Sequence, residues 1–212
     1  MRPALVGCVV LWTLPLAAGC NLLTPLVFIG EHKRKILPEF DKLAQSRAAV
    51  LVWTDQATLF DYPHARFELA TYVTEKLQTE MSQRDLGTDL VDPRDMEDFL
   101  QKDISAQTDP KAVGRHFEVD FVIWVEVYRF QIRDPEQPQF LQGTIEASVV
   151  AWDRRTDAEA PTRFELTPVE CIYPEGSPVL MNATNSRLVR EQTYRKFAEQ
   201  VARKFYEHTV DL

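Results

Sequence analysis

The sequence predicts an α/β fold: a mixed sheet of about four to five strands with helices on both faces, ending in a long C-terminal helix. Residues 119–132 (VDFVIWVEVYRFQI) are apolar on both faces of a strand, as in a central strand that is covered on both sides. Strand and helix patterns alternate before this stretch, which favours parallel pairing with right-handed crossovers. Alternating apolar and polar residues follow it, which favours antiparallel strands.

The first half contains the predicted crossovers. Residues 47–53 indicate a buried strand, and residues 55–63 a loop. The next segment, which ends near Gly87, is predicted as an amphipathic helix with one apolar stripe: Ala70, Val73, Leu77 and Met81. A short strand is expected at 89–91.

Two short helices should follow, because the same signal occurs twice. Asp92-Pro93 and Asp109-Pro110 each place an N-cap aspartate before a proline that suits the first helical position. The second helix is expected to end near Phe117 and to lead directly into the central strand.

The second half is predicted to be antiparallel. Residues 142–152 alternate as a half-exposed strand, and residues 163–166 form a strand near an edge, because Pro161 and Pro168 flank it. Residues 174–184 are expected to be a loop. The last helix should run from about 186 to 208, with one apolar stripe: Tyr194, Phe197, Val201 and Phe205.

Composition excludes several classes of protein. The apolar fraction of 45% over 212 residues indicates an ordinary folded domain, and a net charge of −8 argues against nucleic acid as a partner. Three cysteines occur, and Cys8 and Cys20 both lie in the N-terminal apolar segment. Cys171 is therefore expected to be a small buried hydrophobic residue rather than a nucleophile.

The N-terminus resembles the signal of bacterial lipoproteins. One positive charge precedes an apolar run, and the run ends in Leu16, Ala17, Ala18, Gly19 and Cys20. In that family the signal is cut before the cysteine, which then carries the lipid. The resemblance implies a membrane-lipid anchor at Cys20. Asn21, in place of an aspartate, implies the outer membrane facing the periplasm, with the inner membrane as the alternative.

These signals divide the chain into three parts. Residues 1–19 are expected to be a lipoprotein signal peptide, residues 20–45 the lipidated cysteine with a membrane-proximal tether, and residues 46–212 a single periplasmic α/β domain. An uncleaved transmembrane helix over the uncharged residues 3–30 is an alternative. Pro15 and Pro25 interrupt it, and the basic residues 33–35 would lie on the exported side, against the usual charge bias. A cytosolic protein is the third possibility.

The predicted domain resembles the periplasmic α/β domain of the curli secretion (CsgG-like) lipoproteins. The LpoB-like activator lipoproteins and the amino-terminal domain of TolB share that fold. Three segments carry the resemblance: 48–52 (AAVLV), 112–123 (AVGRHFEVDFVI) and 148–156 (SVVAWDRRT). The chain departs from the family pattern at Val119, where a small residue is common, and at Asp157, where the turn usually has glycine. The resemblance implies an accessory protein of the bacterial envelope.

No motif indicates catalysis. Isolated glycines form no phosphate-binding loop, the four histidines lack metal-ligand spacing, and no nucleophile elbow is present. We therefore expect no cofactor, no metal site and no enzymatic activity. Asp55 and Asp61, after a strand, leave a carboxylate-dependent envelope hydrolase as a weaker alternative.

The function predicted from the sequence is that of a lipid-anchored, non-catalytic protein that binds another envelope protein or supports assembly of an envelope complex. A structural subunit of a homo-oligomeric envelope or secretion assembly is the alternative. Exposed loops or a sheet edge are the expected contact surfaces. The candidate partner contacts are Asp55, Phe60, Asp61, Tyr62, His64, Tyr173 and Pro178.

Overall fold

The computed structural model describes residues 33–133, 136–155, 157 and 160–211. The expected signal peptide, with Leu16, Ala17, Ala18, Gly19 and Cys20, lies outside the described residues. The chain divides into a compact unit, Leu37–His208, and a second unit. In the second unit, β1 (Lys33–Ile36) pairs with β8 (His208–Asp211) in a two-stranded sheet.

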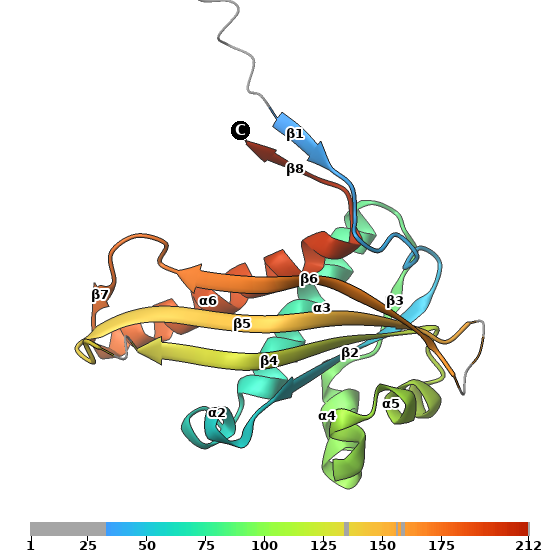
Figure 1. Cartoon of the computed structure of the whole chain (residues 1–212), viewed down its shortest axis with the longest axis horizontal. Helices are drawn as coiled ribbons and strands as arrows, with labels where there is room; N and C mark the ends of the chain where they lie inside the picture. The colour runs from blue at the N-terminus through green and yellow to red at the C-terminus, as the bar shows by residue number, and fades with distance from the viewer. Residues whose placement is uncertain (1–32, 134–135, 156, 158–159, 212) are drawn as a thin grey trace, which may run out of the picture. The chain divides into compact units, whose positions relative to one another are not determined.

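The compact unit is built on a mixed sheet with the strand order β3-β2-β4-β5-β6, in which β7 also pairs with β5 (Figure 1). Its strands are β2 (Arg47–Thr54), β3 (Asp89–Leu90), β4 (Phe121–Arg133), β5 (Phe140–Asp153), β6 (Thr162–Tyr173) and β7 (Val179–Leu180). β2 runs parallel to β3 and β4, whereas β4, β5 and β6 are antiparallel. The predicted mixed α/β sheet is confirmed.

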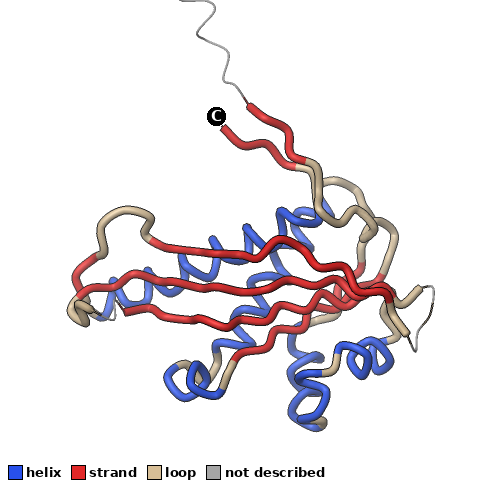
Figure 2. Tube along the Cα trace, viewed as in Figure 1, coloured by secondary structure: helices blue, strands red, loops and turns tan. Residues whose placement is uncertain are grey.

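Helices lie on both faces of this sheet, as predicted. α3 (Ala65–Gln83) and α6 (Ala183–Ala202) pack against each other and run behind the strands in Figure 1. On the other face, α4 (Pro93–Lys102), η1 (Ile104–Thr108) and α5 (Pro110–Phe117) gather beside one end of the sheet (Figure 2). The expected aspartate caps are present, since the Asp92 and Asp109 carboxylates each accept a backbone N–H bond at 2.8 Å.

The main core lies between the sheet and the α3–α6 pair. Phe121, Ile123 and Val125 of β4 face this core, where Leu77 of α3 and Phe197 of α6 cover them. All of these side chains are fully buried, and removal of their apolar surface from water is the main stabilising contribution. The predicted apolar stripes of both long helices are thus confirmed as core positions.

One glycine brings α6 into direct contact with the sheet. A Cβ atom at Gly143 of β5 would lie 1.9 Å from the Thr193 hydroxyl oxygen of α6. Thr193 is fully buried, and its hydroxyl donates to the Val189 carbonyl at 2.6 Å, so this side chain is not free to move aside. Any residue larger than glycine at position 143 must push the helix away from the strand.

Four segments differ from the predictions. The expected loop 55–63 contains a short helix, α2 (Gln56–Asp61), because the Asp55 carboxylate caps it by accepting the Thr58 N–H at 2.7 Å. The expected loop 174–184 contains β7 and the start of α6. Part of the expected tether belongs to the fold, since Phe40 and Leu43 are buried and the compact unit begins at Leu37. The long C-terminal helix is present, but η2 (Arg203–Phe205) and β8 follow it.

A partly buried ion pair, between the buried Asp153 and the exposed Arg155, lies at the end of β5. The Arg155 guanidinium donates to both carboxylate oxygens of Asp153, at 3.1 and 2.9 Å. The Lys42 ammonium lies 3.9 Å from the same carboxylate. These groups, above all Arg155, hold the pKa of Asp153 below its ordinary value.

Gly143→Ala should lower the free energy of unfolding by about 1–3 kcal/mol, because the added methyl group overpacks the β5–α6 contact. Chemical denaturation followed by circular dichroism measures this change. Gly176→Ala is the matched control, since a Cβ atom there meets nothing within 4 Å. Equal stability of the two variants would show that β5 and α6 are not in close contact.

Asp153→Asn should destabilise the protein at neutral pH and lose its effect in acid. Because the pKa of Asp153 is lowered on folding, its ionised form contributes stability above its unfolded pKa of about 4, and this contribution is lost as the pH falls further. Unfolding free energies at pH 7 and pH 3 test this, with the exposed Asp98→Asn as control. A constant difference between Asp153→Asn and the parent protein at both pH values would contradict it.

Candidate functional site

Among the described residues, only one end of the sheet face opposite α3 and α6 is covered. There, η1 and α5 contribute Ala106 and Val113 to a small second core with Leu51 of β2 and Val122 of β4. Further along β4, on the same face, Trp124 is half-buried and Glu126 is exposed. Helices are thus packed against both sides of β4, as expected. On the side opposite α3 and α6, however, the short helices cover only the first residues of β4.

A β-bulge also changes which residues of β4 share that face. The pairing with β5 shifts between Val127 and Arg129, so that Tyr128 is the extra residue. Tyr128 is 53% exposed, whereas Phe130 turns into the main core. Strict alternation along β4 would place Tyr128 and Phe130 on the same face as Trp124. The bulge at Tyr128 breaks this alternation and turns Phe130 to the opposite face.

The three tryptophans of the compact unit lie on this open face. In the strand register, Trp53 pairs with Glu126, Trp124 with Val150, and Trp152 with Val122. Paired residues project from the same face of a sheet, so the three indoles share one surface. None of these tryptophans was predicted from the sequence as a site residue. The available signal was Glu126, a charge that interrupts an otherwise apolar strand between Trp124 and Tyr128.

Two of these tryptophans line a depression that we call the tryptophan groove. It has a cavity volume of about 140 Å³. Its walls are Trp124, Glu126, Ser148, Val150, Trp152 and Arg163. The Arg163 guanidinium lies 5.9 Å from the Trp152 ring, and the Ser148 hydroxyl donates to Glu126 over 3.4 Å. The groove thus has an apolar floor with one cation and one anion at its rim.

Both groove tryptophans carry an unmatched donor. The Nε1 atoms of Trp124 and Trp152 are buried, and neither has an acceptor among the described residues. An indole N–H that is buried without an acceptor costs free energy.

The sheet edge at β6 is partly blocked. The Thr167 N–H donates to the Glu39 carboxylate at 2.6 Å, Pro168 has no N–H, and the Lys196 ammonium donates to the Ile172 carbonyl at 2.8 Å. Free backbone groups on an edge strand are what an added strand would require. A sheet edge was predicted as a possible contact surface. The edge strand β6 is long, but these contacts make it a poor site for the addition of another strand.

The predicted contact residues lie outside the tryptophan groove. Asp55 caps α2, which lowers the pKa of its carboxyl through the Thr58 hydrogen bonds. Asp61 is at the other end of α2, about 9 Å away along the axis, so the two acids do not form a close pair. Phe60 is 87% exposed, and His64 is exposed as well.

The remaining three predicted contacts are partly buried. The Tyr62 ring packs edge-on against Phe130 with centroids 4.7 Å apart, and burial raises the pKa of its phenol. Tyr173 rests against the main core, and Pro178 is half-buried just before β7.

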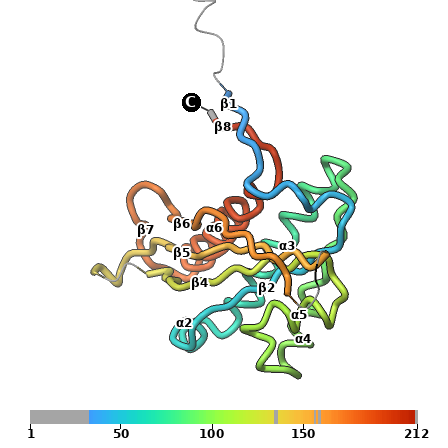
Figure 3. Tube along the Cα trace, turned by 45° about the vertical axis from the view of Figure 1, so that its right-hand side comes forward, coloured from blue at the N-terminus to red at the C-terminus, as the bar shows by residue number. Residues whose placement is uncertain are grey.

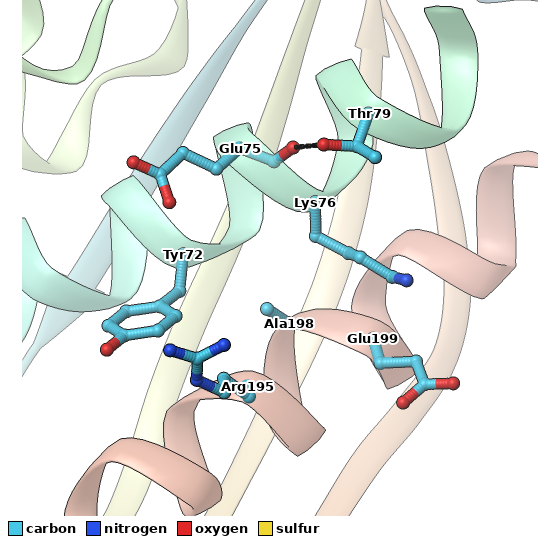
Figure 4. A pocket seen from close by; sticks show the side chains of 7 residues that line it. All are labelled: Tyr72, Glu75, Lys76, Thr79, Arg195, Ala198 and Glu199. Carbon is cyan, nitrogen blue, oxygen red and sulfur yellow. Dashed lines mark hydrogen bonds between the residues drawn. The ribbon is translucent and has the colours of Figure 1, made fainter. Parts of the chain in front are cut away.

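A second depression lies between α3 and α6 (Figure 4). It has a volume of about 400 Å³ and is lined by Tyr72, Glu75, Lys76, Thr79, Arg195, Ala198 and Glu199. Two of its charges are engaged by neighbours in sequence: Lys76 bonds Glu80 at 2.6 Å, and Arg203 of η2 bonds Glu199 at 2.5 Å. Two acidic and two basic side chains line this depression, so its charge favours neither an anionic nor a cationic ligand.

The one cysteine in the described part of the chain lies in the main core. Burial raises the pKa of Cys171 to about 12, so its thiol stays protonated at neutral pH in the core. Among the described residues, no group of three or more histidine, cysteine or acidic side chains is placed to hold a metal ion.

No family model matches this chain, and no curated protein matches it. Among solved structures, it is similar to a PelC dodecamer subunit from Paraburkholderia phytofirmans, with 10% identity over 82% of this chain and 96% of that chain and a TM-score of 0.46. It is also similar to lipoprotein GNA1162 from Neisseria meningitidis, with 12% identity over 72% and 97% of the two chains and a TM-score of 0.38. Likenesses this distant assign no function. Membership of the CsgG-like family stays a prediction.

In the native protein, the Cys171 thiol should be inert. Residues 31–212 keep every described residue and contain Cys171 as the only cysteine. We expect no reaction with a thiol reagent such as dithionitrobenzoate at pH 8, because burial excludes the reagent and disfavours the thiolate. One thiol should react in guanidinium chloride, and rapid reaction without denaturant would contradict the buried placement.

Proposed function

We propose that this chain is a lipid-anchored, non-catalytic envelope protein that binds another envelope protein through the open face of its sheet. The observation that carries the proposal is the position of Trp53, Trp124 and Trp152 on one incompletely covered surface. Tryptophan is enriched among the residues that dominate binding energy at protein interfaces.

The surroundings of the groove support a protein partner. Arg163 bonds Glu165 at 3.0 Å and Arg129 bonds Glu146 at 2.8 Å, so charged pairs of both signs surround the apolar floor. An apolar centre inside a polar rim is the usual anatomy of a specific protein interface. The blocked positions of β6 make binding to the face more favourable than strand addition at that edge.

The lipid anchor belongs to the same proposal. The resemblance of residues 16–20 to a lipoprotein signal supports a lipid anchor at Cys20, and Asn21 supports the outer membrane, with the domain in the periplasm. Among the described residues, no helix is both long and apolar enough to cross a bilayer. A tether raises the local concentration of the domain near other membrane-bound proteins, so modest affinity through one groove suffices.

Photo-crosslinking in cells tests the groove. A photoreactive amino acid replaces the exposed Glu126 at the rim, and a control chain carries it at Gln78, exposed on α3 behind the opposite face. We expect a crosslinked envelope protein from position 126 and not from position 78. Ser148→Arg, which fills the groove, should reduce that product about tenfold, as the loss of about 1.4 kcal/mol of binding energy does.

Two further outcomes separate the alternatives. Cys20→Ala should also reduce the product, because it removes the anchor. A product that contains only a second copy of this chain would support the homo-oligomeric subunit instead. Equal products from positions 126 and 78, or a product that Ser148→Arg leaves unchanged, would overturn the groove as the binding site.

A further inference from the structure

The open face of the sheet carries more carboxylates than cations. Residues 122–131 of β4, 144–152 of β5 and 163–172 of β6 contain four glutamates, two arginines and no other charged residue. Figure 3 shows these three strands side by side. The register places all six charged residues on the face of the three tryptophans: Glu126, Arg129, Glu146, Arg163, Glu165 and Glu170.

Both arginines already have a carboxylate partner. Two ion pairs, at 3.0 and 2.8 Å, each join one arginine to one glutamate, Glu165 or Glu146. Glu126 and Glu170 are left over, since neither forms an ion pair with a cation of the described residues. Both side chains are exposed. This part of the face therefore has two negative charges without a counter-charge.

The register adds a repulsion to this imbalance. Glu146 and Glu170 are paired directly across β5 and β6. Like charges that face each other on neighbouring strands are destabilising. Arg129 offsets the charge of Glu146 but not that of Glu170. A cation from outside the chain would stabilise this arrangement, because it would supply the charge that β6 lacks.

The aromatic side chains near Glu126 suit a cationic ligand. Trp53 is the register partner of Glu126 on β2, and Trp124 is two residues away on the same face of β4, so both lie within about 5–7 Å along the backbone. A cation over an indole ring is attracted by the electrons of the ring, most strongly where water is excluded. The groove volume of about 140 Å³ is also suitable. A cavity of about 150 Å³ holds one benzene ring, and a guanidinium is a smaller planar group.

We propose that the partner presents a basic surface and that one arginine side chain of this surface enters the tryptophan groove. Its guanidinium stacks on the Trp124 indole and forms an ion pair with Glu126, while a second basic residue of the partner meets Glu170. Arginine fits better than lysine, because its planar guanidinium stacks on aromatic rings and is more weakly hydrated. This assignment rests on the proposed function, since the arginine belongs to the protein that the groove binds.

Two small probes test the site without knowledge of the partner. N-acetyl-arginine amide carries the guanidinium, and N-acetyl-citrulline amide has the same shape without the charge. The full chain, in a neutral detergent and labelled with fluorinated tryptophan, reports binding by fluorine NMR, and Trp124→Phe identifies the Trp124 signal. We expect this signal to shift with both probes. The dissociation constant should be about tenfold lower for the arginine derivative, as one cation–π contact and one exposed ion pair together provide.

Matched variants identify the carboxylates. Glu126→Gln should abolish the preference for the arginine derivative, because it removes the charge and keeps the shape of the side chain. Glu75→Gln, at an exposed glutamate of α3 behind the opposite face, should keep the preference. Glu170→Gln should unfold at the same temperature as the parent or a higher one, because it removes the repulsion from Glu146. A lower unfolding temperature would overturn the assignment of Glu170.

Crosslinking in cells separates the arginine site from the proposed function. A photoreactive phenylalanine analogue replaces Tyr128, which is 53% exposed, and leaves all four glutamates in place. Glu126→Gln with Glu170→Gln should reduce the crosslinked envelope protein about tenfold, because both ion pairs with the partner are lost. Glu75→Gln should leave the product unchanged.

The outcomes are distinct. Equal affinity for the two probes, a preference that Glu126→Gln leaves intact, or no signal shift with either probe would overturn the arginine site. A crosslinked protein whose yield the double variant leaves unchanged would also overturn it, while the groove would stand as a protein-binding site. Probe binding that depends on Glu126, without any crosslinked envelope protein, would instead overturn the proposed protein partner.

Discussion

The close contact between α6 and β5 at Gly143 and Thr193 determines the layout of the compact unit. Because a glycine on the strand lets the helix approach without an intervening side chain, α6 lies flat along β5 and β6. α3 then fills the space beside it over β2, and the two long helices cover one face completely. Everything that remains for binding is consequently on the other face or at the ends of the strands.

The second face stays open for a simple reason of length. In the part of the chain that the structure describes, the helices on this face are α4, η1 and α5, of which the longest has ten residues. They protect only Val122 and its neighbours at the start of β4. The full lengths of β4 and β5 are 13 and 14 residues, so the described helices leave much of the second face of these strands uncovered. Half-buried tryptophans are suited to that position, since they cover neighbouring side chains in the free protein and present a large surface to a partner.

Local signals predicted most of the fold correctly. Asp92-Pro93 and Asp109-Pro110 fixed two helix starts, because capping depends only on residues close in sequence. The bulge at Tyr128 and the helix α2 were missed for the opposite reason. A bulge depends on the partner strand, and a six-residue helix has too few positions to show a periodic stripe. The tryptophan groove was missed because its residues come from three strands that only the register brings together.

The tryptophan groove depends on the register of three strands at once. Trp124 and Glu126 come from β4, Val150 and Trp152 from β5, and Arg163 from β6. A slip of one residue in a strand would turn its side chains from the open face to the core face. The main core therefore protects the groove as well, because the apolar residues that alternate with the groove residues on β4 and β5 can be buried in only one register.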